Sequence, residues 1–122
     1  MLIAFWIVNV LAALVFIAAG GMKTVRSKEA IVASGLTWAE DFSRTAVRLI
    51  GVAELLGGLG LVLPVLTGVA PVLTPIAAAG LTVIMIGAVV VHVRRRETPL
   101  PAAVLAALAA VSTVLSGIVV FG

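Results

Sequence analysis

Glu54 is the one acidic residue within the long hydrophobic stretches of this 122-residue chain. A carboxylate inside a lipid-spanning helix costs about 2.5–3.5 kcal/mol, so such residues usually face a partner group or a water-filled space. There a carboxylate can form a structural hydrogen bond or ion pair, or it can exchange a proton and bind a cation. Glu54 is therefore the first candidate for a functional residue.

Two further ionisable side chains, Arg48 and His92, are expected near one end of the hydrophobic stretches. With about 1.5 Å of rise per residue, a helix starting near Ala46 puts Glu54 roughly 12 Å and Arg48 roughly 3 Å inside the membrane edge. These two residues point about 120° apart around the helix, so they are not a favourable intrahelical pair. The long arginine side chain could still link the two levels, which predicts a polar cluster of Glu54, Arg48 and His92. The alternative is that Arg48 and His92 are solvated side chains at the membrane interface.

Glycines share the helical face of Glu54. Positions three and four residues apart lie on one side of a helix, and Gly51, Gly57 and Gly58 occupy such positions relative to Glu54. Small residues let helices approach closely, so we expect this face to pack against other helices, away from lipid. By the same argument, a pair of glycines further along the chain marks a second close-packing face: Gly80 and Gly87.

Composition excludes several kinds of chemistry. The chain has no cysteine and one histidine, which excludes a thiol nucleophile, a disulfide and a multi-histidine metal site within one protomer. No Ser-His-Asp set, phosphate-binding loop or metal motif is present. We therefore expect no metal site and no catalytic residue, and an enzyme acting on its own is the less favoured interpretation.

Hydrophobic segments of membrane-spanning length make up most of the chain. Hydrophobic residues are 63% of the total and charged residues 11%, whereas soluble domains have about 45–50% and 25%. About 20 apolar residues cross a bilayer, and four segments reach that length: residues 2–22, 46–66, 75–93 and 101–121. We expect an all-α fold, an integral membrane four-helix bundle, as a single domain over residues 1–122. No basic stretch precedes the first segment, so we expect a retained helix and not a cleaved signal peptide.

The cations indicate an orientation. All eight Lys and Arg residues lie in or beside the first and third connectors: Lys23, Arg26, Lys28, Arg44, Arg48, Arg94, Arg95 and Arg96. The positive-inside rule places these connectors in the cytoplasm and both termini outside. We therefore expect a multi-pass protein of the plasma membrane whose surroundings are the lipid bilayer. No nucleic-acid binding is expected, because topology accounts for the net charge of +3.

The first connector is expected to contain two local structures. Residues 24–34 could form a short amphipathic helix on the membrane surface, ended by Gly35. Thr37 and Glu40 have the spacing of a capping box. They predict a helix that starts near Trp38 and continues into the second span.

A set of small and polar residues extends over nearly the whole chain. It comprises Gly21, Met22 and Lys23 ending the first span, RLIGVAE (Arg48–Glu54) opening the second, and AAAGL (Ala77–Leu81) with His92 in the third. This set resembles the DoxX-like family of small four-span membrane proteins. The resemblance implies a polar site at Arg48, Glu54 and His92. Some members of the family are associated with quinone-linked sulfur oxidation or with membrane assemblies that handle oxidative stress.

These observations leave three functions open. The first is a non-catalytic membrane subunit or binding bundle that holds a lipid-like ligand such as a quinone. Since the chain has no cysteine, electrons would come from the quinone or from a partner protein. The second is a proton-coupled small-molecule transporter using Glu54, which 5% aromatic residues and no tyrosine disfavour. The third is an assembly factor for another membrane protein, and a homodimer or a redox-enzyme partner is compatible with the sequence.

Overall fold

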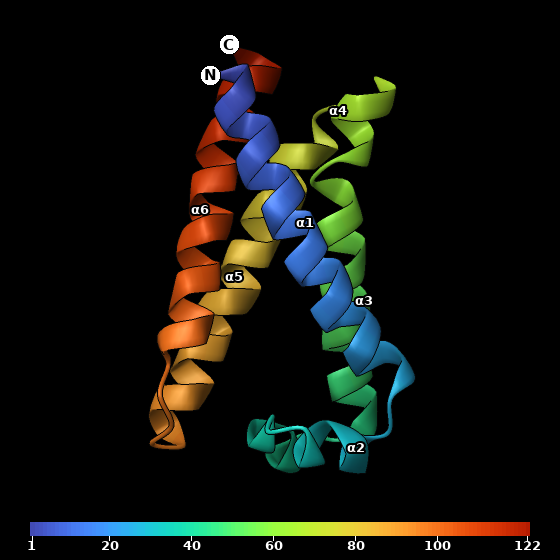
Figure 1. Ribbon diagram of the computed structural model, residues 1–122, viewed down its shortest axis with the longest axis vertical. Helices are drawn as coiled ribbons and strands as arrows, with labels where there is room; N and C mark the ends of the chain where they lie inside the picture. Colours follow the sequence, from blue (N-terminus) through green and yellow to red (C-terminus); the bar gives the residue numbers. More distant parts are fainter.

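The computed structural model describes all residues, 1–122, and is helical throughout (Figure 1). Helix α1 packs along α3, and α5 packs along α6, so the bundle consists of two antiparallel pairs. Both termini lie at one end of the bundle, and the short α2 lies at the other (Figure 1). The elements are α1 (Leu2–Val25), α2 (Lys28–Ala33), η1 (Thr37–Asp41), α3 (Arg44–Gly60), α4 (Leu63–Thr67), α5 (Leu73–Arg94) and α6 (Leu100–Phe121).

Four helical segments are long and apolar enough to cross a membrane: Leu2–Val25, Arg44–Thr67, Leu73–Arg94 and Leu100–Phe121. These segments confirm the four predicted spans, with ends that differ by only a few residues. Large aliphatic side chains are exposed along their outer faces, where lipid replaces water as the solvent. The protein is therefore an all-helical, multi-pass membrane protein.

The first connector folds differently from the expected continuous helix. Ser27 caps α2 by accepting a hydrogen bond from the backbone N–H of Ala30, and Gly35 follows with a positive φ of 109°. The predicted capping box at Thr37 is wrong, because this residue begins a 3-10 helix with no side-chain cap. The chain then extends, and α3 begins at Arg44 with Ser43 as its cap. The connector has a small apolar core that also includes the start of α3: Ile31, Ala39 and Val47.

Pro64 explains why the second span is broken into α3 and α4. Proline has no backbone N–H, so the carbonyl of Gly60, four residues earlier, loses its helical donor. That carbonyl accepts a hydrogen bond from Thr74 Oγ1 at 2.9 Å instead. The next carbonyl, of Leu61, accepts one from Asn9 Nδ2 at 2.8 Å. Side chains of α1 and α5 therefore provide the hydrogen bonds that these two carbonyls lack within the helix. The break lies toward the end of the bundle that holds the termini.

A polar network joins α1 to α6 in the same half of the bundle. Ser112 Oγ donates to Asn9 Oδ1 at 2.8 Å, and Asn9 Nδ2 lies 3.2 Å from Ser116 Oγ. All three side chains are fully buried. Beside them lies the main apolar core: Ala12, Ala13, Phe16, Leu61, Ala78, Leu81, Met85 and Ala109. These contacts hold the two helix pairs together away from the connectors α2 and η1.

The glycines of the third span do not form the expected close-packing face. A Cβ added at Gly80 or at Gly87 would meet nothing within 4 Å. Both positions are exposed on α5, because the side of this helix that packs is the one carrying Ala78, Leu81 and Met85. The prediction of close helix contact at these two glycines is therefore wrong.

Candidate functional site

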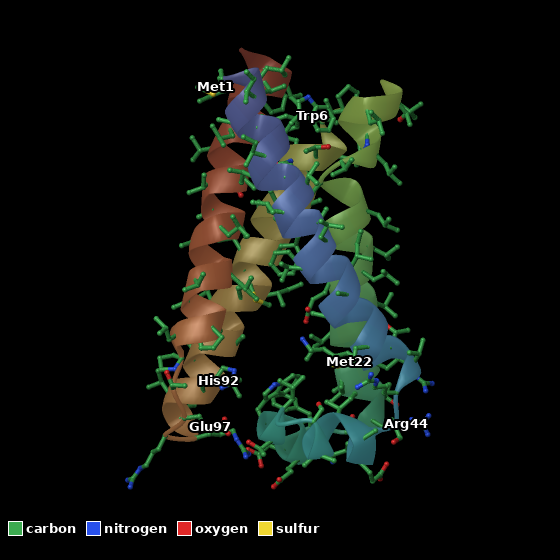
Figure 2. All side chains as sticks on the ribbon, in the orientation of Figure 1. Met1, Trp6, Met22, Arg44, His92 and Glu97 are labelled. Atoms are coloured by element: carbon green, nitrogen blue, oxygen red, sulfur yellow. The ribbon has the colours of Figure 1, made fainter.

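A cavity of about 580 Å³ lies between the two helix pairs, at the end of the bundle that carries the first connector. Its walls are mostly apolar, and Lys23, Glu54 and His92 are its only ionisable side chains. Figure 2 shows Met22 of α1 and His92 of α5 on opposite sides of this space. The lining residues are Ala19, Met22, Lys23, Leu36, Trp38, Phe42, Ile50, Glu54, Ile84, Met85, Gly87, Ala88, Val91, His92, Pro101, Ala102 and Leu105.

Glu54 forms an ion pair with Lys23 inside the bundle. Lys23 Nζ lies 2.7 Å from Glu54 Oε1, and the two side chains are 11% and 1% exposed. The Lys23 ammonium also lies 5.5 Å from the ring centroid of Trp38, within the range of a cation–π contact. The carboxylate that lipid would exclude is thus neutralised by a cation from the neighbouring helix.

Two glycines bring the helices close enough for this pair. A Cβ on Gly20 of α1 would lie 2.5 Å from the carbonyl oxygen of Gly51 on α3, and one on Gly51 would lie 2.7 Å from Lys23 Cβ. Both distances are shorter than real Cβ contacts. The backbones of α1 and α3 therefore cross at these residues, which places the last turn of α1 beside Glu54.

The other two glycines of the predicted face also pack against helices. A Cβ on Gly58 would lie 2.8 Å from Ile17 Cγ1 of α1, whereas one on Gly57 would lie 2.7 Å from Leu81 Cδ2 of α5. Gly57 is thus on the side of α3 that meets the second helix pair. Together these contacts fix the rotation of α3, which directs Glu54 to the cavity.

The structure brings two of the three predicted polar residues to one cavity. Glu54 and His92 both line it, from α3 and α5. Arg48 does not line it and is exposed on α3, and its side chain makes no hydrogen bond or ion pair. The cation that contacts Glu54 is Lys23, and the polar contact of His92 is with Glu97 at 3.3 Å.

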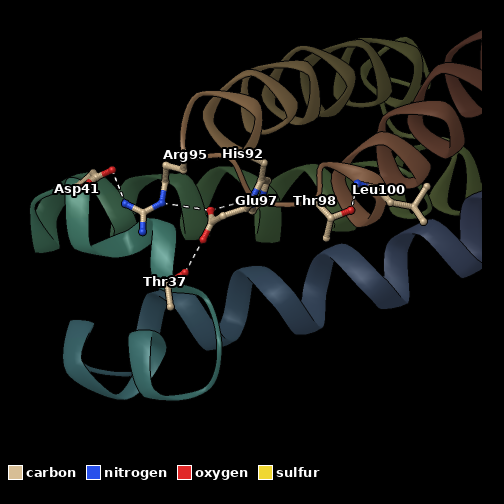
Figure 3. A network of polar contacts seen from close by, with 7 residues as sticks. All are labelled: Thr37, Asp41, His92, Arg95, Glu97, Thr98 and Leu100. Carbon is tan, nitrogen blue, oxygen red and sulfur yellow. Dashed lines mark hydrogen bonds and ion pairs between the residues drawn. The ribbon is translucent and has the colours of Figure 1, made fainter.

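A polar network links η1 to the connector between α5 and α6, at the same end of the bundle as the cavity (Figure 3). Thr37 Oγ1 donates to Glu97 Oε2 at 2.5 Å, and Arg95 Nε donates to Glu97 Oε1 at 3.1 Å. Arg95 also pairs with Asp41. The 36–42 segment held in this way contributes three apolar side chains to the cavity: Leu36, Trp38 and Phe42. We call the residues of this polar network the latch: Thr37, Asp41, His92, Arg95 and Glu97.

The latch perturbs two ionisable groups outside the spanning helices. The hydrogen bond from Thr37, followed by the charge of Arg95, lowers the pKa of Glu97 below its ordinary value of 4.5, although partial burial opposes this shift. The hydrogen bond to Asp41 raises the pKa of Arg95 above its already high ordinary value. Both shifts favour the charged forms, so Glu97 and Arg95 are both charged at neutral pH.

Lys23, Glu97 and Asp41 belong to the site in the structure but were not among the site residues predicted from the sequence. From the sequence, Lys23 is interpreted as a topological cation and as part of the family resemblance, and not as a partner of Glu54, although it follows Gly20 and Gly21 at the end of the first span. The sequence does contain a matching signal. Lys23 lies one turn after Gly20, and Glu54 lies one turn after Gly51, so a close approach of the two glycines would bring the two side chains together. Asp41, Arg95 and Glu97 lie at or in connectors, and no sequence pattern marked them as site residues.

The fold and the cavity define a class: a small four-span membrane protein with a ligand-sized apolar cavity that contains one buried ion pair. The sequence model of the DoxX-like family matches residues 7–115. The chain therefore belongs to the DoxX-like family. No curated protein and no solved structure gives a significant match to the chain.

Proposed function

We propose that this protein is a non-catalytic membrane subunit that binds a lipid-like small molecule, such as a quinone, in the cavity between its helix pairs. The observation that supports the proposal is the cavity itself. Its volume of about 580 Å³ lies within the range of about 300–1,000 Å³ of small-molecule sites. Apolar walls with a few convergent polar groups are also typical of such sites.

The lining residues fit a ligand with an apolar body and one polar end. Met22, Met85 and Leu105 offer soft apolar surface, and methionine adapts well to aromatic rings. The Lys23–Glu54 pair supplies polar contacts on the opposite side from His92. A quinone would contribute reversible redox chemistry when bound, while these side chains bind and orient it.

The ion pair favours binding over cation transport. A cationic substrate that used Glu54 would first have to displace the Lys23 ammonium, which lies 2.7 Å from the carboxylate. An uncharged amphiphile can occupy the cavity and leave the pair intact. The positive-inside rule places the latch in the cytoplasm, so we infer that the ligand lies in the inner leaflet of the plasma membrane.

The proposal is tested by filling the cavity. A Cβ at Gly87 meets nothing within 4 Å, and Gly87 lines the cavity, so Gly87→Phe places a large ring there without a backbone clash. Gly80→Phe is the matched control, since this glycine is equally open on the same helix but does not line the cavity. Each variant is purified in lipid nanodiscs, and the retained small molecules are measured by mass spectrometry.

We expect the wild type and Gly80→Phe to retain the same apolar molecule at close to one per protein. Gly87→Phe should lose most of it. Equal retention in all three proteins, or no specific molecule in any of them, would contradict the proposed function.

A further inference from the structure

The Lys23–Glu54 pair uses only part of its hydrogen-bonding capacity within the protein. Glu54 Oε1 accepts from Lys23 Nζ, whereas Oε2 accepts no hydrogen bond from any protein donor. No side-chain oxygen fully enclosed by the protein lacks a partner. Glu54 is 1% exposed and lines the cavity, so the accessible part of its carboxylate is Oε2, facing the cavity.

Lys23 presents donors beside this acceptor. An ammonium group has three N–H donors, and one of them is used by Glu54 Oε1. The other two have no protein oxygen as partner, and the nearest aromatic face is that of Trp38. One wall of the cavity therefore offers a free acceptor and a free donor next to each other.

The charge of the pair restricts the ligand. Lys23 and Glu54 neutralise each other, and Arg48 lies outside the cavity. His92, on the opposite wall, already contacts Glu97. A charged head group would lose its hydration on entering the apolar cavity and would find no unpaired opposite charge to compensate for that loss, so its binding is unfavourable. An uncharged head group avoids this cost.

We propose that the cavity selects an uncharged amphiphile that carries a hydroxyl group, a proposal that rests on the ligand-binding function above. The hydroxyl donates its hydrogen to Glu54 Oε2 and accepts a hydrogen bond from Lys23 Nζ. Its apolar body lies against the methionine and aromatic side chains of the walls. Among quinone-like ligands, a ring with only carbonyl oxygens offers Oε2 no hydrogen, whereas the reduced, hydroxyl-bearing ring does.

The test compares two probes that differ in the hydroxyl hydrogen. One is a bromoalkyl phenol, and the other is its methyl ether with the same alkyl chain. Trp38 lines the cavity, so quenching of its fluorescence by bromine reports occupancy. A Trp6→Phe background leaves Trp38 as the only tryptophan, since the chain has two. Binding is measured in phosphatidylcholine nanodiscs, as the mole fraction of probe in the bilayer at half-saturation.

We expect the phenol to bind at least about 10-fold more tightly than the ether, the effect of one charge-assisted hydrogen bond. Equal affinities for both probes would overturn the hydroxyl selectivity and leave the ligand-binding function standing. Binding of neither probe would overturn both.

Two charge-neutral double variants assign the selectivity to the pair. K23M/E54M removes the free acceptor and the donor but keeps apolar volume, so both probes should bind with affinities within about threefold of each other. The control R48M/E29M removes one cation and one carboxylate that are both exposed and outside the cavity, and it should keep the full preference. A preference that survives in K23M/E54M would overturn the assignment, and the wild-type comparison decides the question should this variant not fold.

Discussion

The Lys23–Glu54 pair gives the sharpest prediction for stability, because its two members are buried to different degrees. Lys23→Met leaves a carboxylate that is 1% exposed without a countercharge, and breaking a buried pair in this way costs about 3–5 kcal/mol. Glu54→Met leaves Lys23, whose side chain is 11% exposed on the last turn of α1. Its long stem can turn the ammonium toward water, so we expect a smaller cost of about 1–3 kcal/mol.

The double variant K23M/E54M removes both charges together. Replacing a buried ion pair with apolar side chains of similar volume is often neutral or stabilising, so its cost should be well below the sum of the two single costs. The free energy of unfolding is measured by reversible denaturation in mixed detergent micelles, followed by circular dichroism. Arg48→Met is the control, since this cation on α3 is exposed and has no polar partner, and it should stay within about 0.5 kcal/mol of the wild type. A Lys23→Met cost no larger than that of Arg48→Met, or strictly additive single costs, would refute the argument.

Three further predictions concern packing, the latch and the helix break. Gly51→Ala should cost at least about 1–3 kcal/mol, because the new Cβ overlaps α1, whereas Gly21→Ala, with nothing within 4 Å, should not destabilise in the same unfolding assay. Since the pKa of Glu97 is lowered in the folded protein, its contribution to the latch is present above pH 4.5 and is lost as the pH falls below that value. Acrylamide quenching of Trp38, in the 36–42 segment that the latch holds, should therefore rise on acidification. Glu97→Gln should show the raised quenching already at neutral pH, and no pH dependence in the wild type would contradict this. Asn9→Leu leaves the buried carbonyl of Leu61 at the break without its donor, so it should lower the free energy of unfolding by at least about 1 kcal/mol. A smaller cost would show that the network does not stabilise the break.

The four spans could be predicted from the sequence because their signal is composition and length. Glycine spacing around Glu54 also indicated which face of the second span meets other helices. The cause of the break, a proline four residues after Gly60, is visible in the sequence. The hydrogen bonds that Asn9 and Thr74 donate to the carbonyls at the break depend on two other helices. The hydrophobic pattern predicts which segments form helices, but not how each helix is rotated about its axis relative to its neighbours.

That missing rotation explains the unexpected partner of Glu54. Arg48 is near Glu54 in the sequence, yet a spacing of six residues sends the two side chains to different faces of α3. Lys23 is 31 residues away and reaches Glu54 because α1 and α3 cross at Gly20 and Gly51. The same limit applies to η1 and the latch, which depend on how two connectors meet in space.

We infer that the cavity between the helix pairs holds an amphiphile with its polar end at Glu54. A crystal structure of the protein grown from a lipidic mesophase with the bromoalkyl phenol tests this most directly, because the anomalous signal of bromine locates the alkyl chain. We expect a bromine peak among the apolar lining residues and the phenol oxygen within hydrogen-bond distance of Glu54 Oε2 and Lys23 Nζ. A cavity closed by the helix pairs, or bromine found only on the lipid-facing surface, would contradict it.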